Sequence, residues 1–241
     1  MYDLATFSLR DMTECGAALR KCGRDASNME VVANRMVQYL YDQLRDGITE
    51  ERACSLVRFF KTHPFCALEP DLQRFARQML GVDSAHASMK CLTLLATAGK
   101  ESTWNARNES AGHKAVPLLS DEMVARFPMI SQLIGQFGLD VGKVLQPDEK
   151  FLLDHEQTTY NVFHVPQALG SPVIPAQKDF VIPYGIRSVL GFGGMLPTGD
   201  LFATILFSRV AISREQAEMF RPLALSVKVA LLDIADEAVF A

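Results

Sequence analysis

The sequence has few of the features that would assign it to a specialised class of protein. Its longest apolar runs, CLTLLATA and VALL, are far below the roughly 18 residues that a membrane helix needs. Its Lys and Arg residues form no dense cluster and the formal net charge is −4, so no nucleic-acid-binding surface is indicated. The N-terminus carries Asp3 and no apolar stretch, which excludes a secretory signal. We therefore expect a cytoplasmic protein that binds neither membrane nor nucleic acid.

The sequence also lacks a cysteine pattern that would hold a metal or a disulfide framework. Zinc ligands usually come in pairs two to four residues apart, and no Cys-x-x-Cys occurs. Cys15 and Cys22 share one face of a predicted helix but are too far apart for a disulfide. In a chain without an export signal the thiols are expected to be reduced. The five cysteines are Cys15, Cys22, Cys54, Cys66 and Cys91.

Common catalytic and nucleotide-binding motifs are missing as well. No Gly-x-Ser-x-Gly or His-Glu-x-x-His occurs. The glycine cluster GFGG at 191–194 lies in a strand pattern that leads into a turn and a second strand, whereas a phosphate-binding loop opens a helix. Gly191, Gly193 and Gly194 therefore predict a bulge or a sheet face that a packed helix or a ligand approaches closely.

What the sequence does have is enough material for one large core. Hydrophobic residues make up 49% of the 241 residues and charged residues 22%, which predicts one large domain or one domain with an extension. Apolar periodicity predicts helices at 8–23, 27–46 with a Ser27–Glu30 capping box, 70–80, 120–138 with a break at Pro128, and 213–239. Alternation predicts strands at 53–62, 90–99, 115–119 and 159–165, and a hairpin of 186–196 and 200–213.

The last predicted helix carries a heptad stripe and contains Pro222, which should bend or restart it. The stripe allows two interpretations. It covers the sheet with one face, or its last turns project outward and pair with a second copy of the chain. The stripe consists of Ala217, Phe220, Ala224, Val227, Leu231, Ile234 and Ala238.

The order of these elements resembles the GAF family of small-molecule sensor domains, relatives of PAS domains. CLTLLATAG (91–99) resembles the family's second strand, 161–208 its second half with Gly-Ile-Arg-Ser before a hairpin, and 212–231 its closing helix. The resemblance implies an α+β fold: a central antiparallel sheet of five to six strands flanked by helices, with a helical insertion in its middle. It divides the chain into an N-terminal helical extension, 1–26, and a GAF-like domain, 27–241, that ends in a signalling and dimerisation helix, 213–239.

Such domains stand at the N-terminus of bacterial histidine kinases and nucleotide cyclases, so the resemblance also implies a homodimer and a fused or separate kinase or cyclase output module. The sequence departs from the family in places. Its middle, 100–158, is longer than usual, and Gln167 stands where an Asp is common. The family's cyclic-nucleotide signature, Asn-Lys-x-Phe-Asp-Glu, is missing, and so is the Cys-His dipeptide that attaches bilins in phytochromes.

Candidate site residues follow from their place near the expected pocket. His164 could contact a ligand or ligate a haem, although a lone histidine among apolar neighbours is more often part of the core. Apart from His164 as a haem ligand, no metal ligand is expected. HEQTT at 155–159 is not a phospho-acceptor box, since it precedes a strand and no ATP-binding region follows. The predicted ligand-binding set is Trp104, Phe163, His164, Tyr184, Arg187 and Phe192.

These residues favour a non-catalytic sensor domain that binds a small molecule of unknown identity and relays its presence through the terminal helices. Three alternatives remain open: a haem-binding gas or redox sensor, a GAF-like enzyme with a reactive thiol, and a dimerisation module with a filled core.

Overall fold

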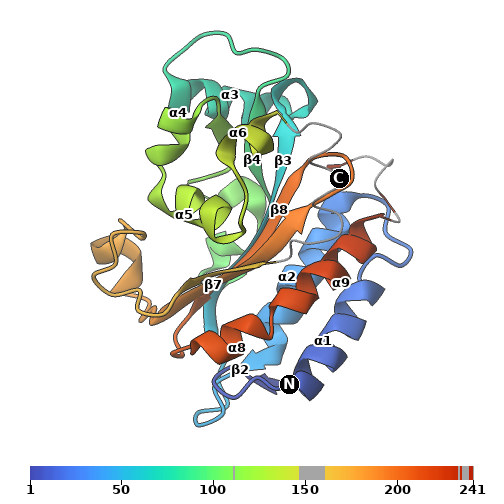
Figure 1. Cartoon of the computed structure of the whole chain (residues 1–241), viewed down its shortest axis with the longest axis vertical. Coiled ribbons are helices and arrows are strands. Elements are labelled where there is room, and N and C mark those ends of the chain that lie inside the picture. The colour runs from blue at the N-terminus through green and yellow to red at the C-terminus, as the bar shows by residue number, and fades with distance from the viewer. Residues whose placement is uncertain (111, 147–160, 233, 235–238, 241) are drawn as a thin grey trace.

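The computed structural model describes residues 1–110, 112–146, 161–232, 234 and 239–240. Its centre is an antiparallel sheet of six strands in the order β5-β4-β3-β8-β7-β6 (Figure 1). The predicted α+β class with an antiparallel sheet of five to six strands is confirmed. The sheet strands are β3 (Cys54–Pro64), β4 (Lys90–Gly99), β5 (Ala115–Leu118), β6 (Asn161–Val165), β7 (Ser188–Met195) and β8 (Leu201–Ser208); two short parallel strands, β1 (Tyr2–Asp3) and β2 (Leu44–Arg45), pair separately.

The central strand β3 separates two hydrophobic cores. Successive side chains of a strand point to opposite faces, and here both faces are covered. Phe59 contributes to one core and Phe60 to the other. The strand begins one residue later and ends two residues later than predicted, since His63 and Pro64 still pair with β4.

Four helices cover the first face of the sheet, which we call the helix face (Figure 1). α2 lies over β3 and β4, α9 lies over β7, and α1 packs on α9. The ring of Phe7 stacks on Phe220 with centroids 4.4 Å apart, so residues from the predicted N-terminal extension share this core. The helices are α1 (Leu9–Lys21), α2 (Met29–Gln43), α8 (Arg214–Glu218) and α9 (Arg221–Leu232).

One predicted helix start is wrong. The structure places Asn28, not Ser27, at the N-cap of α2, where the Asn28 side chain accepts the Val31 N–H at 2.9 Å. Glu30 does not complete a capping box with Ser27. Its carboxylate instead accepts a hydrogen bond from Arg107 Nε at 2.7 Å.

The predicted C-terminal helix is divided into α8 and α9. Ser213 caps α8, accepting the Gln216 N–H. Pro222 is the second residue of α9, where its missing N–H is tolerated, so it restarts the helix. The heptad stripe from Ala217 to Ile234 is buried, which matches the interpretation that it covers the sheet. Ala238 and most of the predicted segment beyond Leu232 lie outside the described residues.

Short helices and loops cover the opposite face, which we call the cavity face. Pro128 begins α5, so the predicted break at this proline is confirmed. HEQTT and the rest of 147–160 lie outside the described residues. This side carries α4 (Asp121–Ala125), α5 (Pro128–Gln136), α6 (Val141–Leu145) and a π-helical turn (Gln177–Val181); α3 (Pro70–Leu80) lies beside β5, and short 3-10 turns are η1 (Phe65–Ala67), η2 (Ser102–Trp104) and η3 (Arg107–Glu109).

The glycine-rich strand β7 is approached closely, but mainly by its neighbours in the sheet rather than by the packed helix or ligand that the sequence predicted. A Cβ on Gly191 would lie 2.8 Å from Ile205 Cδ1, and a Cβ on Gly193 would lie 2.1 Å from the Phe202 carbonyl oxygen. Side chains and backbone of the sheet itself occupy this space. The GFGG segment is therefore the first strand of a hairpin with β8.

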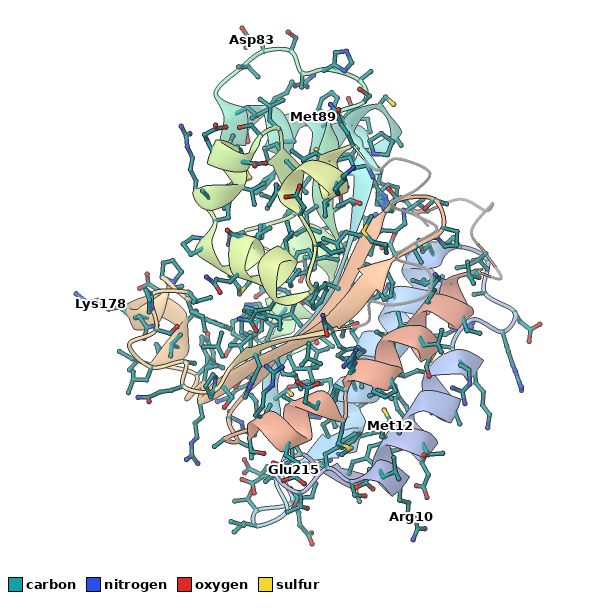
Figure 2. All side chains as sticks on the ribbon, in the orientation of Figure 1. Arg10, Met12, Asp83, Met89, Lys178 and Glu215 are labelled. Atoms are coloured by element: carbon teal, nitrogen blue, oxygen red, sulfur yellow. The ribbon has the colours of Figure 1, made fainter. Side chains whose placement is uncertain are left out.

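Charged side chains lie mainly at the periphery, as Arg10, Asp83, Lys178 and Glu215 illustrate in Figure 2. None of the helices in the described part of the chain is long and apolar enough to cross a membrane.

Candidate functional site

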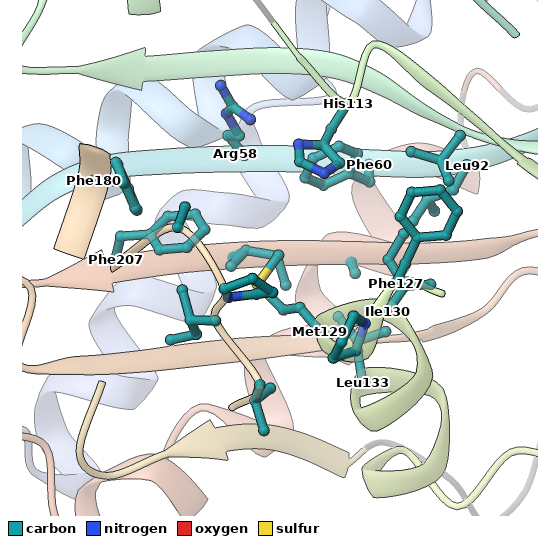
Figure 3. Close-up of a pocket in the computed structure, with 18 of the residues that line it drawn as sticks. Arg58, Phe60, Leu92, His113, Phe127, Met129, Ile130, Leu133, Phe180 and Phe207 are labelled. Carbon is teal, nitrogen blue, oxygen red and sulfur yellow. The ribbon is translucent and has the colours of Figure 1, made fainter. Parts of the chain in front are cut away.

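The cavity face contains a cavity of about 420 Å³. Its floor consists of side chains of β3 and β8, among them Phe60, Ala203 and Ile205. α5 covers it from one side and the segment 173–176 from another. Figure 3 shows Met129, Ile130 and Leu133 of α5 facing the sheet, with Phe180 beside Phe207. The cavity lies within the size range of small-molecule sites, roughly 300–1,000 Å³.

The lining is apolar except for three basic residues. Arg58 rises from the floor, His113 comes from the loop before β5, and Arg126 is an exposed residue at the end of α4. Among the described lining residues there is no Asp or Glu. The cavity therefore combines an apolar body with positive charge that no lining carboxylate neutralises.

Arg58 lies on the central strand between Leu56 and Phe60. Its Nη2 donates to Ser110 Oγ at 3.0 Å, while its Nε is buried without a hydrogen-bond partner. No carboxylate of the described residues forms an ion pair with it. Because burial disfavours the charged form, the pKa of Arg58 falls to about 10. At neutral pH the cavity thus holds a desolvated cation.

The loop that carries Ser110 and His113 is anchored from outside the cavity. Arg107 donates from Nε and Nη2 to Glu30 of α2 and from Nη1 to Glu69, just before α3, at 2.7–3.0 Å. Bidentate pairing of this kind fixes orientation as well as distance. It holds η3 in place, and so positions Ser110 and His113 against Arg58.

His113 faces the same end of the cavity as Arg58 (Figure 3). Loss of water around its ring, and then the charge of Arg58, lower its pKa from the usual value, although the residue as a whole is exposed. The imidazole is therefore neutral at pH 7 and offers one donor and one acceptor.

A second unpaired polar group lies beside Arg58. Thr97 is directly opposite Arg58 in the β3–β4 register, so the two side chains share the cavity face. Thr97 is 3% exposed and its hydroxyl has no hydrogen-bond partner. Buried polar groups are normally paired, and such exceptions often mark functional positions.

Of the residues predicted from the sequence, Trp104 lines the cavity. Tyr184 lies behind it, with ring centroids 4.5 Å apart. Phe163 is fully buried on the cavity face, opposite Gly191 on the neighbouring strand, but it is not part of the cavity wall.

The other three predicted residues lie away from the cavity. The ring of Phe192 packs on the helix face, 5.7 Å from Phe220. Arg187 is exposed. His164 is buried near α8, where its Nε2–H donates to the Ile212 carbonyl at 3.0 Å. This nitrogen is occupied and lies on the face opposite the cavity, so His164 does not fit a haem held there.

Sequence reasoning missed Arg58, although a signal was present. The alternating pattern of the strand places a charged residue between two apolar ones on the same face, at Leu56, Arg58 and Phe60. An arginine that is largely buried in such a position needs a partner, and that requirement indicates a candidate site. The contributions of Ser110, His113 and Thr97 depend on tertiary structure.

The cysteines do not provide a reactive thiol in the cavity. None of them is among the described lining residues. Burial raises the pKa of Cys15, Cys54 and Cys91 to about 12, and raises that of Cys22 as well. These four thiols stay protonated at neutral pH, whereas a nucleophilic cysteine needs a lowered pKa.

A separate charged cluster secures the β7–β8 hairpin. Asp200 accepts from Lys61 at 2.9 Å and lies 3.4 Å from Lys90. His63 is 2% exposed beside this cluster, and its Nε2 has no partner. Desolvation, and then the charge of Lys61, lower its pKa to about 3. The cluster joins β3 and β4 to the β7–β8 turn and has a structural role.

Comparisons with known proteins show little similarity to this chain. No family model matches the sequence, and no curated protein matches it. A structural match is the phycoerythrobilin-bound GAF domain from a cyanobacterial phytochrome, with 10% sequence identity, a TM-score of 0.38, and coverage of 95% of this chain and 98% of that chain. What the cavity can bind follows from this chain's own residues.

Proposed function

We propose that this protein is a non-catalytic sensor domain that binds a small molecule in the cavity described above. The observation that carries the proposal is a largely apolar cavity of about 420 Å³ on one face of the sheet, with a few polar groups at one end. This combination is typical of small-molecule sites.

The proposed signal passes through the sheet to the helix face. The cavity residues Phe60 and Ala203 are sequence neighbours of Phe59 and Phe202, which stack 6.3 Å apart on the helix face. A ligand that displaces the cavity side of β3 and β8 would therefore change the packing under α2 and α9. It can shift the protein only as far as it binds one arrangement more tightly than the other.

We further propose that the protein acts as a homodimer in the cytoplasm, with a kinase or cyclase as fused or separate output. An exposed apolar stripe on α9 supports pairing with a second copy: Leu225, Val229 and Leu232 are 49%, 38% and 42% exposed at i, i+4, i+7 spacing. The five free cysteines support a reducing compartment.

The haem and thiol alternatives have less support. His164 points away from the cavity, and the four cysteines with raised pKa values are not activated. The cavity itself is difficult to reconcile with a module whose core is filled.

Mass spectrometry of the purified protein, native and then denatured, tests the sensor proposal. A retained small molecule should appear in the native spectrum and be absent from the denatured one. Met129→Trp, which fills the cavity from α5, should abolish retention. Met219→Trp on the helix face is the matched control and should preserve it. Retention that is equal in both variants would place the ligand elsewhere and contradict the proposal.

Solution scattering tests the dimer. The wild-type chain should be dimeric at tens of micromolar, and Leu225→Ser with Val229→Ser should make it monomeric because the apolar contact is lost. A monomeric wild-type protein under these conditions would refute the dimer but would leave the proposed ligand cavity unaffected.

A further inference from the structure

The end of the cavity formed by Arg58 has features that its apolar walls do not explain. A desolvated guanidinium is costly unless an acceptor faces it. Arg58 nevertheless has one hydrogen bond among the described residues, to Ser110, and a buried Nε without a partner. Ser110 cannot supply charge, and its own hydroxyl donates to the Gly112 carbonyl at 3.2 Å.

The surroundings of Arg58 are arranged for a single anionic group. The hydroxyl of Thr97, 3% exposed and unpaired, lies opposite Arg58 on the same face. The ring of His113 lines the same end (Figure 3). A carboxylate can accept several hydrogen bonds at once and matches the planar guanidinium. Arg58 and His113 supply donors at the cavity wall, from the strand β3 and the loop before β5, while Thr97, which is not among the described lining residues, lies next to Arg58 on the same face.

The rest of the cavity limits what the anion can be attached to. Away from Arg58 the floor continues through Phe60, Ala203 and Ile205, and the cover is apolar. No described lining residue is acidic, so an ammonium group would find no partner. This argues against amino acids and against ligands that carry several charges along their length.

We propose that the ligand is a small apolar monocarboxylate, whose carboxylate pairs with Arg58 while its apolar body lies over Phe60 and Ile205 beneath α5. The inference rests on the proposed function, because it names the ligand class of the same cavity.

The single tryptophan, Trp104, lines the cavity and reports binding directly. Its fluorescence, excited at wavelengths that phenyl groups do not absorb, can be titrated with 5-phenylvalerate and with its neutral analogue 5-phenylvaleramide. The acid should bind at least about tenfold more tightly than the amide, as expected for a charge-assisted pair in a desolvated site.

Variants assign the preference to Arg58. Arg58→Met should remove the preference while the amide's affinity stays within about twofold, because only the charged pair is lost. Arg58→Gln serves the same purpose if the methionine variant does not fold. Arg187→Met, which removes an exposed arginine outside the cavity, is the matched control and should keep the preference.

Two results would overturn the inference. One is equal affinity of the wild-type protein for acid and amide, which leaves a small-molecule cavity without an anion requirement. The other is no binding of the acid at all; in that case retention of a neutral molecule in native mass spectra would still uphold the proposed function.

Discussion

The two faces of the sheet differ in how completely they are packed. On the helix face, large side chains such as Phe59, Phe202 and Phe220 are fully buried against α2 and α9. On the cavity face, short helices and loops leave about 420 Å³ open above the same strands, with a desolvated arginine in the floor. The comparison indicates that close packing is concentrated on one side, and that the cavity in which we propose a ligand lies on the other.

The largest expected effect on this comparison comes from two neighbouring phenylalanines on β3. Phe59→Ala should cost about 3–5 kcal/mol of unfolding free energy, because it leaves a void in a closely packed core. Phe60→Ala should cost roughly half as much, since the Phe60 side chain already borders a cavity. Urea unfolding measures both. Equal costs would show that the cavity face is packed as tightly as the helix face.

Two glycines on β7 provide the next test. Gly193→Ala should destabilise the protein by about 1–3 kcal/mol, because the new Cβ would meet the Phe202 backbone, which cannot easily move. Gly191→Ala should cost less, since its nearest contact is the end of the Ile205 side chain. Thermal unfolding of the two variants compares them, and the reverse order would contradict the close backbone approach.

A smaller effect concerns the charged cluster around His63. Its folded pKa of about 3 lies below the usual 6.5, so the unfolded chain takes up a proton first as the pH falls. Stability should therefore decrease between pH 6.5 and 3, by about 1–2 kcal/mol at pH 5. Asp200, whose pKa is lowered mainly by Lys61 against its own desolvation, acts in the same direction at lower pH.

Replacing this histidine isolates its part. His63→Leu should remove its share of the loss between pH 7 and pH 5 in urea unfolding, while the exposed His86→Leu should leave it unchanged. If both variants keep the wild-type slope, His63 does not hold the depressed pKa.

Much of the fold could be predicted because local signals and packing agree. The strand at 90–99 and the helix at 70–80 have the predicted bounds, since alternation and an N-terminal proline mark them. The N-cap of α2 was predicted at Ser27 instead of Asn28, because Glu30 has capping-box spacing from Ser27. In the structure Glu30 pairs with the distant Arg107 instead.

The site was less predictable than the fold. Trp104 lines the cavity, but Phe192 and His164 point to the opposite face, which the register of their strands decides. In the sequence Arg58 is an ordinary charged residue. Only the tertiary structure shows that the loop carrying Ser110 packs against it. To predict which residues line a pocket, one must therefore know which face of the sheet each side chain points to, as well as which strand carries it.

The central claim is that Arg58 binds a ligand at the expense of stability. Thermal unfolding of wild type and Arg58→Met, with and without 5-phenylvalerate, tests it most directly. Without ligand, Arg58→Met should be more stable by about 1–3 kcal/mol, because a desolvated charge is removed. With the acid, the wild type should gain markedly more stability than the variant. An Arg58→Met protein that is less stable without ligand, and equally stabilised by the acid, would contradict the account.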